Sequence, residues 1–141
     1  AFGAHGIMTL NDFKALEGSN PAFDALISPT PGGKGTVITG PNPGDVFAQL
    51  SPPEQVAAAM ERLVAEPHGP RSTPLHLSPE RWGSRPRTYV ECTADRTIPI
   101  ASQRRMQEHS PGARIVTLDA DHSPFLSRPR ELADTLIAAI P

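Results

Sequence analysis

Residues 88–99 read TYVECTADRTIP and residues 114–125 read RIVTLDADHSPF, and these two stretches decide the fold class. Each begins with a short run of β-branched and apolar residues and continues into a polar loop, which is typical of a buried strand and its following turn. Helical patterns follow both, at 97–109 and from about 127 onward. Strands that alternate with helices indicate a parallel layer, so we expect an α/β fold with strands at Thr88–Cys92 and Arg114–Leu118.

The last helix is expected to pack on this sheet, because its apolar residues recur at helical spacing on one face. That apolar arc consists of Leu132, Ala133, Leu136, Ile137 and Ile140.

The first 86 residues have a different composition. Most of the chain's seventeen prolines fall there, in short helical stretches separated by turn formers. We expect helices near 9–16 and 22–27, an irregular loop over 29–43, and no strand. A longer helix is expected from Ser51, where Ser51-Pro52-Pro53-Glu54 fits a capping box. This pattern predicts a loop-rich cap at 1–86 and a core at 87–141.

Composition excludes some classes of function. A net charge of −2 gives no field that would attract nucleic acid or an anionic membrane. No apolar run approaches the roughly 20 residues of a membrane span. One cysteine, Cys92, permits no internal disulfide, and we expect a cytoplasmic location.

Asp95 and His122 are the candidate catalytic pair. Each follows a predicted strand, and the carboxyl ends of neighbouring parallel strands meet at one edge of a sheet, where α/β proteins place their active groups. A carboxylate on one ring nitrogen fixes a histidine's tautomer, while the other nitrogen activates a nucleophile. On spacing alone, Asp95 could equally cap the following helix, with His122 in an ordinary turn.

Residues 86–140 resemble the C-terminal part of the α/β-hydrolase superfamily, in the branch of plant salicylate methyl esterases and hydroxynitrile lyases. The resemblance rests on 89–99, on Gln103 and Met106, and on 121–129. It implies that Asp95 is the triad acid and His122 the base, and that residues 1–86 form the cap. Hydroxynitrile lyases of this branch carry lysine directly after the histidine; Ser123 stands there in this chain, which favours ester hydrolysis.

The nucleophile of such a hydrolase is absent from these 141 residues. It precedes the acid in the chain and sits in Gly-x-Ser-x-Gly, and no serine here has glycine both two residues before and two after it. We therefore expect the α/β-hydrolase sheet to be incomplete without an N-terminal half. The sequence starts at Ala1 without an initiator methionine, so we expect that half as a separate polypeptide. The two chains would then form a heterodimer in which the N-terminal half supplies the serine and the oxyanion hole, and this chain would be inactive alone.

An apolar ester pocket is expected around the pair. Its predicted substrate-binding residues are Phe13, Phe23, Trp82, Ile98, Ser123 and Phe125, and Phe2 and Phe47 are further aromatic candidates. We expect Cys92 to be a buried core residue rather than a nucleophile. No metal or other cofactor is expected, because Asp119, Asp121 and His122 are too close in sequence to converge on one ion.

Two other functions stay open at this point. One is a non-catalytic module that binds a small molecule or a protein on a hydrolase scaffold. The other is a lyase or transferase that uses the same triad, as hydroxynitrile lyases do.

Overall fold

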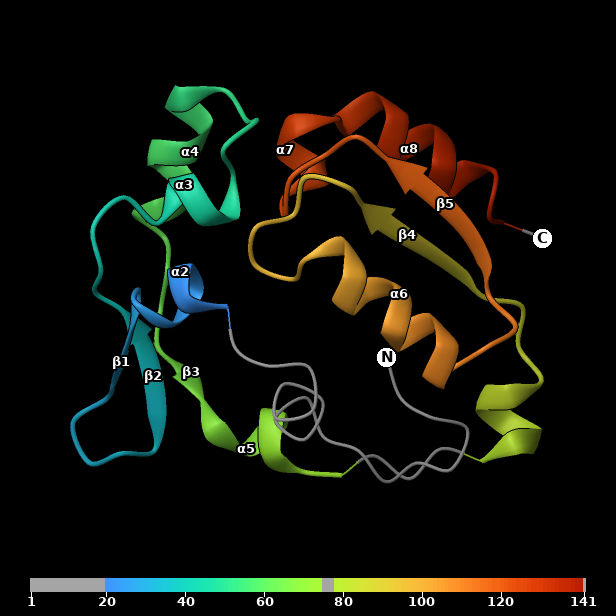
Figure 1. Cartoon of the computed structure of the whole chain (residues 1–141), viewed down its shortest axis with the longest axis horizontal. Helices are drawn as coiled ribbons and strands as arrows, with labels where there is room; N and C mark the ends of the chain where they lie inside the picture. The colour runs from blue at the N-terminus through green and yellow to red at the C-terminus, as the bar shows by residue number, and fades with distance from the viewer. Residues whose placement is uncertain (1–19, 75–77, 141) are drawn as a thin grey trace.

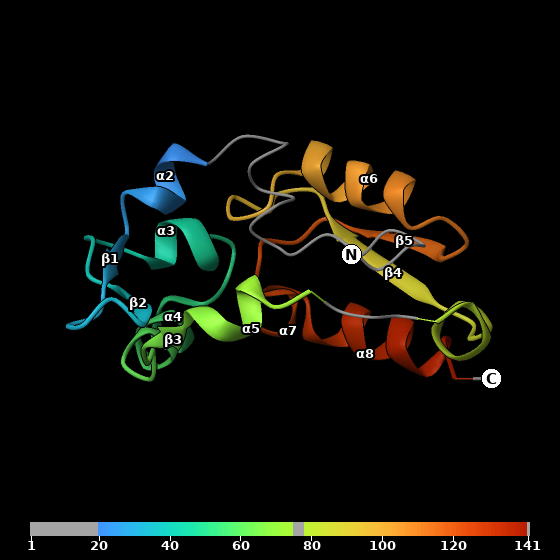
Figure 2. The same cartoon turned by 90° about the horizontal axis from the view of Figure 1, so that it is seen from below.

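The computed structural model describes residues 20–74 and 78–140. Two parts lie side by side in Figure 1: a small sheet with short helices in the N-terminal region, and a layered C-terminal region. Figure 2 shows the layers of the latter, with helix α6 (Ile100–His109) on one face of the strands and helix α8 (Pro129–Ile137) on the other. The helix predicted near 9–16 lies outside the described residues.

The C-terminal layer contains the two predicted strands at the predicted positions. β4 (Thr88–Cys92) and β5 (Arg114–Leu118) pair in parallel, with Thr88 opposite Arg114 and Cys92 opposite Leu118. β-branched residues in both strands favour this extended pairing. The structure therefore confirms the predicted α/β arrangement.

The core of this layer lies toward the carboxyl ends of the strands. Cys92, Leu118 and Ala120 are buried there, and Leu132 of α8 packs against them. The rest of the predicted apolar arc is largely exposed, since Leu136, Ile137 and Ile140 retain 56%, 67% and 72% of their accessible surface. In the described residues, α8 thus reaches this core mainly through Leu132.

The N-terminal region contains strands where none was predicted. β1 (Ile27–Pro29), β2 (Gly35–Ile38) and β3 (Glu66–Pro67) form an antiparallel sheet in the order β1-β2-β3. Gly32 and Gly33, with φ of +87° and +67°, turn the chain between β1 and β2. The predicted loop over 29–43 was wrong because strands of two to four residues are too short to show alternation.

Short helices fill the remainder of this region. They are α2 (Pro21–Asp24), α3 (Gly44–Phe47), α4 (Pro53–Met60) and α5 (His68–Ser72). The π-helical turn η1 (Pro79–Gly83) lies near the start of β4 (Figure 1), and α7 (Pro124–Ser127) precedes α8 in the C-terminal region. A second core joins Phe23, Leu26 and Val46. The capping box predicted at Ser51 was wrong: α4 begins at Pro53 without a side-chain cap, and the Ser51 hydroxyl donates to Asp121.

No helix within 20–74 or 78–140 is both long and apolar enough to cross a bilayer.

Glu91 of β4 is a buried carboxylate that links the strands to α6. It accepts hydrogen bonds from Arg104, Gln107 and Thr117. The Arg104 hydrogen bond holds the pKa of Glu91 below its usual value, against the opposing effect of burial. We expect Glu91→Gln to lower the free energy of unfolding at pH 7 by roughly 1–2 kcal/mol, a small effect because Arg104 is largely solvated.

This stabilisation should vanish in acid. A carboxyl group with a lowered folded-state pKa stabilises the fold above its unfolded-state pKa of about 4.3 and ceases to do so as the pH falls through the folded value. Urea denaturation at pH 7 and at about pH 3 should show the difference between wild type and Glu91→Gln shrinking at the lower pH. Glu108→Gln, at an exposed position of α6, is the control; an equal effect at both pH values would contradict the account.

Candidate active site

Asp95 and His122 come together as the sequence predicts. Asp95 lies in the loop after β4, His122 in the loop after β5, and the parallel pairing places both loops at one edge. His122 Nδ1 lies 2.9 Å from Asp95 Oδ2. Because a carboxylate only accepts, Nδ1 carries the proton in this contact, which leaves Nε2 free to accept one. The Asp95 side chain is 7% exposed and that of His122 is 32% exposed.

The second oxygen of Asp95 caps the turn that follows. Its Oδ1 accepts from the backbone amides of Thr97 and Ile98 at 2.7 and 2.8 Å. The alternative that Asp95 caps the following helix was wrong, because α6 begins after Pro99 without a side-chain cap and Asp95 binds the turn before it. This double attachment fixes the carboxylate's orientation toward the histidine, as a triad acid requires.

The Gln103 side chain of α6 hydrogen-bonds to both ends of the loop that carries Asp95. Its side-chain oxygen accepts from the Cys92 amide at 2.9 Å, and its Nε2 donates to the carbonyls of Cys92 and Ile98 at 2.9 and 2.8 Å. One buried carboxamide thus joins the end of β4 to the start of α6. In the sequence, Gln103 was only one of the residues that carry the family resemblance, and nothing there indicated its hydrogen bonds.

Asp121 is completely buried and links the two parts of the molecule. Its Oδ2 accepts from the Leu50 amide at 2.9 Å and from the Ser51 hydroxyl at 3.0 Å. Its Oδ1 accepts from the Ser123 amide and the Ser127 hydroxyl, both at 2.9 Å. These contacts hold the residue next to His122 against the N-terminal region.

Residues 45–51 contact both the Asp95 loop and Asp121, and we call this line of contacts between the two regions the seam. Gln49 Nε2 donates to the Ala94 carbonyl at 2.6 Å, and Arg96 Nη1 donates to the Asp45 carbonyl at 3.0 Å. Thr97 Oγ1 donates to the Val46 carbonyl at 3.3 Å. Sequence reasoning missed this seam because its acceptors are main-chain carbonyls, which every residue carries.

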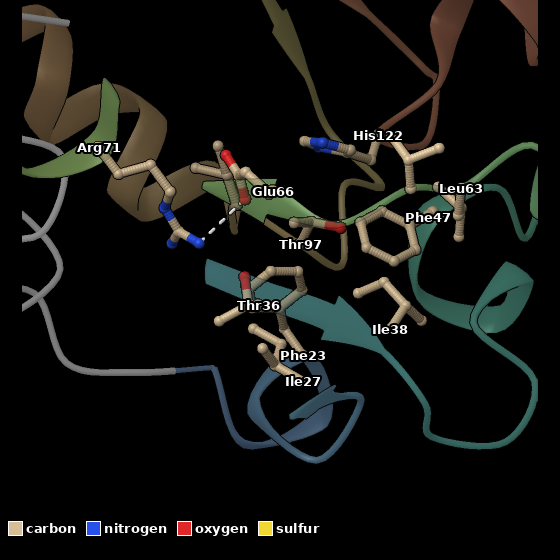
Figure 3. Close-up of a pocket in the computed structure, with 12 residues that line it drawn as sticks. Phe23, Ile27, Thr36, Ile38, Phe47, Leu63, Glu66, Arg71, Thr97 and His122 are labelled. Carbon is tan, nitrogen blue, oxygen red and sulfur yellow. Dashed lines mark hydrogen bonds and ion pairs between the residues drawn. The ribbon is translucent and has the colours of Figure 1, made fainter. Parts of the chain in front are cut away.

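A largely apolar cavity of about 300 Å³ opens at the pair (Figure 3). His122, Ile98 and Phe23 line it, as the sequence predicts for Ile98 and Phe23. Phe47 also lines the cavity. The centroids of the Phe47 and His122 rings are 5.9 Å apart, and the Phe47 ring makes an edge contact with the Phe23 ring. The remaining lining residues are Ile27, Thr36, Ile38, Leu63, Val64, Glu66, Arg71 and Thr97.

Three predicted pocket residues lie elsewhere, contrary to the prediction. Trp82 in η1 stacks under the Arg87 guanidinium, 5.1 Å from the ring centre. Phe125 in α7 is 62% exposed, and Ser123 is buried with its amide bonded to Asp121. The sequence positions of Trp82 and Ser123 did not reveal their contacts with Arg87 and Asp121. Phe13 and Phe2 lie outside the described residues.

Cys92 is buried in the core of the C-terminal layer, as predicted. Burial, with smaller contributions from Asp95 and Asp121, raises the pKa of its thiol to about 11. A thiol protonated at neutral pH is a poor nucleophile. Across 20–74 and 78–140, no three His, Cys, Asp or Glu side chains gather in a way that could hold a metal ion.

A family model described as the alpha/beta hydrolase family matches residues 5–135. The chain belongs to this family. Methylesterase 9 of Arabidopsis thaliana is 33% identical over 105 residues, which are 72% of this chain and 41% of that protein. The family membership confirms the predicted fold class, and the methylesterase relatives confirm the predicted branch.

A bacterial hydrolase is also similar. A pyrethroid hydrolase of Sphingobium wenxiniae is 36% identical over 93 residues, 65% of this chain and 33% of that protein. The crystal structure of a pyrethroid hydrolase from Sphingobium faniae JZ-2 superposes with a TM-score of 0.82 and 29% identity, covering 97% of this chain and 56% of that one. This alpha/beta hydrolase chain therefore spans about half the length of the solved structure it matches.

The Asp121 contacts predict a coupled loss of stability and activity. Asp121→Ala leaves four donors without their acceptor, so we expect the free energy of unfolding to fall by roughly 3 kcal/mol. We also expect kcat of the complete hydrolase to fall by about tenfold or more, because the adjacent His122 loses its fixed position. Urea denaturation and steady-state kinetics measure the two effects.

Asp119→Asn is the matched control, since the Asp119 side chain is 82% exposed and lies two residues away. It should change neither quantity appreciably. Equal effects of the two variants would contradict the role given to Asp121.

Proposed function

We propose that this chain supplies the acid, the histidine and the cap of a serine-type carboxylesterase that acts on small, largely apolar esters. The observation that carries the proposal is the 2.9 Å contact between Asp95 and His122, with the histidine lining an apolar cavity. Relatives named as methylesterases and as a pyrethroid hydrolase support ester chemistry. Residues 1–86 are the proposed cap and residues 87–141 the proposed part of the core.

The first half-reaction forms an acyl-enzyme. The serine oxygen attacks the ester carbonyl carbon while His122 Nε2 takes the serine proton. Collapse of the tetrahedral intermediate breaks the bond to the alcohol oxygen, and His122 returns the proton to the departing alcohol. Asp95 stays ionised throughout and stabilises the imidazolium through Nδ1.

Water completes the cycle by the same proton path. His122 Nε2 takes a proton from water as the hydroxide oxygen attacks the acyl carbon, and it then gives that proton to the serine oxygen as the carboxylic acid leaves. Backbone amides of an oxyanion hole bind the negative oxygen at both tetrahedral stages.

We propose that the nucleophile and oxyanion hole come from an N-terminal half, expected above as a separate polypeptide. Two features support a partner beside this layer. In the described residues the parallel sheet has two strands, β4 and β5, and parallel sheets are normally larger and covered on both faces. Ile115, Leu136, Ile137 and Ile140 also expose apolar surface near β5 and α8. The cytoplasmic location stays a prediction.

The pair is tested in the complete hydrolase with short-chain esters. Asp95→Asn should lower kcat by about 10⁴-fold, because a carboxamide no longer holds the Nδ1–H tautomer, and His122→Ala should lower it at least as much. KM should change little, since neither group supplies most of the substrate contacts. Asp45→Asn, at an exposed position whose backbone carbonyl alone joins the seam, is the control.

A serine-directed fluorophosphonate separates the roles of the two halves. It should label a serine of the N-terminal half in the complete hydrolase and no serine of residues 1–141 alone. Labelling within residues 1–141, or kcat unchanged in both variants, would contradict the proposal; hydrolysis replaced by cyanohydrin cleavage would favour the lyase alternative.

A further inference from the structure

One side of the cavity carries an arginine that the hydrolytic chemistry does not use. Arg71 of α5 lines the cavity together with Glu66 of β3 and His122. Figure 3 shows the Arg71 side chain reaching toward Glu66, and Nη1 donates to Glu66 Oε2 at 3.1 Å. The Arg71 side chain is only 13% exposed, whereas that of Glu66 is 55% exposed. A charged pair is therefore part of a largely apolar wall.

The hydrogen-bonding capacity of Arg71 is far from filled. A guanidinium presents five N–H donors, and the bond to Glu66 uses one of them. Among the residues that the structure describes, the Nε–H is buried without a partner. The guanidinium lines the cavity, and its two Nη groups carry the other three N–H donors. A ligand that brings an acceptor oxygen to this wall would therefore use donors that the bond to Glu66 leaves open.

The charge of the pair limits what that acceptor is. Glu66 already balances the Arg71 charge, so a second carboxylate from a ligand would be attracted by Arg71 and repelled by Glu66 at close range. A neutral oxygen with lone pairs, such as an ether or a ketone, accepts from the guanidinium without this repulsion. The site therefore favours a neutral acceptor.

Stability gives little reason for the pair to be here. Ion pairs with one half-exposed partner contribute little to folding, because water screens them. An arginine in a small pocket does restrict which ligands bind. A ligand without an acceptor would displace water from the guanidinium and leave its donors unpaired, which costs free energy. The position is thus suited to discriminating between ligands.

We propose that Arg71 is a specificity-determining residue that donates a hydrogen bond to a neutral acceptor oxygen carried by the ester away from its scissile bond. The inference rests on the proposed function, since it assumes that an ester occupies this cavity with its carbonyl at His122. It narrows the substrate class from apolar esters to apolar esters with a remote ether or carbonyl oxygen.

Binding of uncleavable analogues tests the subsite separately from the reaction. The probes are ketones isosteric with methyl phenylalkanoates, each with one side-chain methylene replaced by an ether oxygen, titrated calorimetrically into the complete hydrolase. At one or more positions we expect the ether to bind about tenfold more tightly than its hydrocarbon counterpart. Arg71→Met should remove this preference and change the hydrocarbon's affinity by less than about threefold.

Two further variants sharpen the assignment. Arg85→Met, at an exposed arginine outside the cavity, should retain the full preference for the ether. Glu66→Gln should increase the affinity for an analogue that carries a remote carboxylate, because it removes the opposing charge while keeping a side chain of the same shape.

Two results would overturn the proposal: no ether that binds better than its hydrocarbon in the wild type, or an Arg71→Met variant that weakens both ligands equally. Kinetics with the matching methyl esters are measured in parallel. An ether preference without any ester hydrolysis would contradict the proposed function and leave the subsite standing.

Discussion

The buried carboxylate of Asp121 joins the N-terminal and C-terminal regions of the described structure. A fully buried charge costs several kcal/mol to desolvate, and only charge-assisted hydrogen bonds of good geometry offset that cost. Asp121 has four, two from Leu50 and Ser51 and two from Ser123 and Ser127. Because its donors come from both regions, neither can move without leaving a buried charge partly unpaired.

This attachment determines the geometry of the proposed catalytic pair. His122 directly follows Asp121, and Phe47, which packs near the histidine ring, lies three residues before Leu50. Asp95 is held independently, by Thr97 and Ile98 on one oxygen and through Gln103 at the base of its loop. Acid and base thus meet from two preorganised loops, so little reorganisation remains for the reaction itself.

The sequence predicts the C-terminal layer well and the N-terminal region poorly, for a physical reason. β4 and β5 are runs of five residues rich in β-branched side chains, and each ends in a buried residue, Cys92 and Leu118. The ends of both strands, and with them Asp95 and His122, could therefore be located. The hairpin of β1 and β2 depends on positive φ at Gly32 and Gly33, and strands this short carry no periodicity. Local preference therefore could not distinguish it from a loop.

Long-range partners explain the other errors. Ser51 has the local pattern of a helix cap, but its hydroxyl donates to the Asp121 carboxylate seventy residues away. Trp82 was predicted to line the pocket, but its ring packs against the Arg87 guanidinium. Arg71 stands in a proline-rich stretch whose path toward the cavity no local pattern indicates. Such contacts belong to the tertiary fold, and the family resemblance implied only the contact between the acid and the histidine.

The proposed chemistry requires that Asp95 hold His122 with its proton on Nδ1, so that Nε2 is unprotonated. NMR of the complete hydrolase with ¹⁵N-labelled histidine tests it directly at a pH where the ring is neutral. We expect a proton on Nδ1 of His122 with a strongly downfield resonance, no proton on Nε2, and loss of that resonance in Asp95→Asn. A neutral His122 ring protonated on Nε2, with a spectrum unchanged by Asp95→Asn, would contradict it.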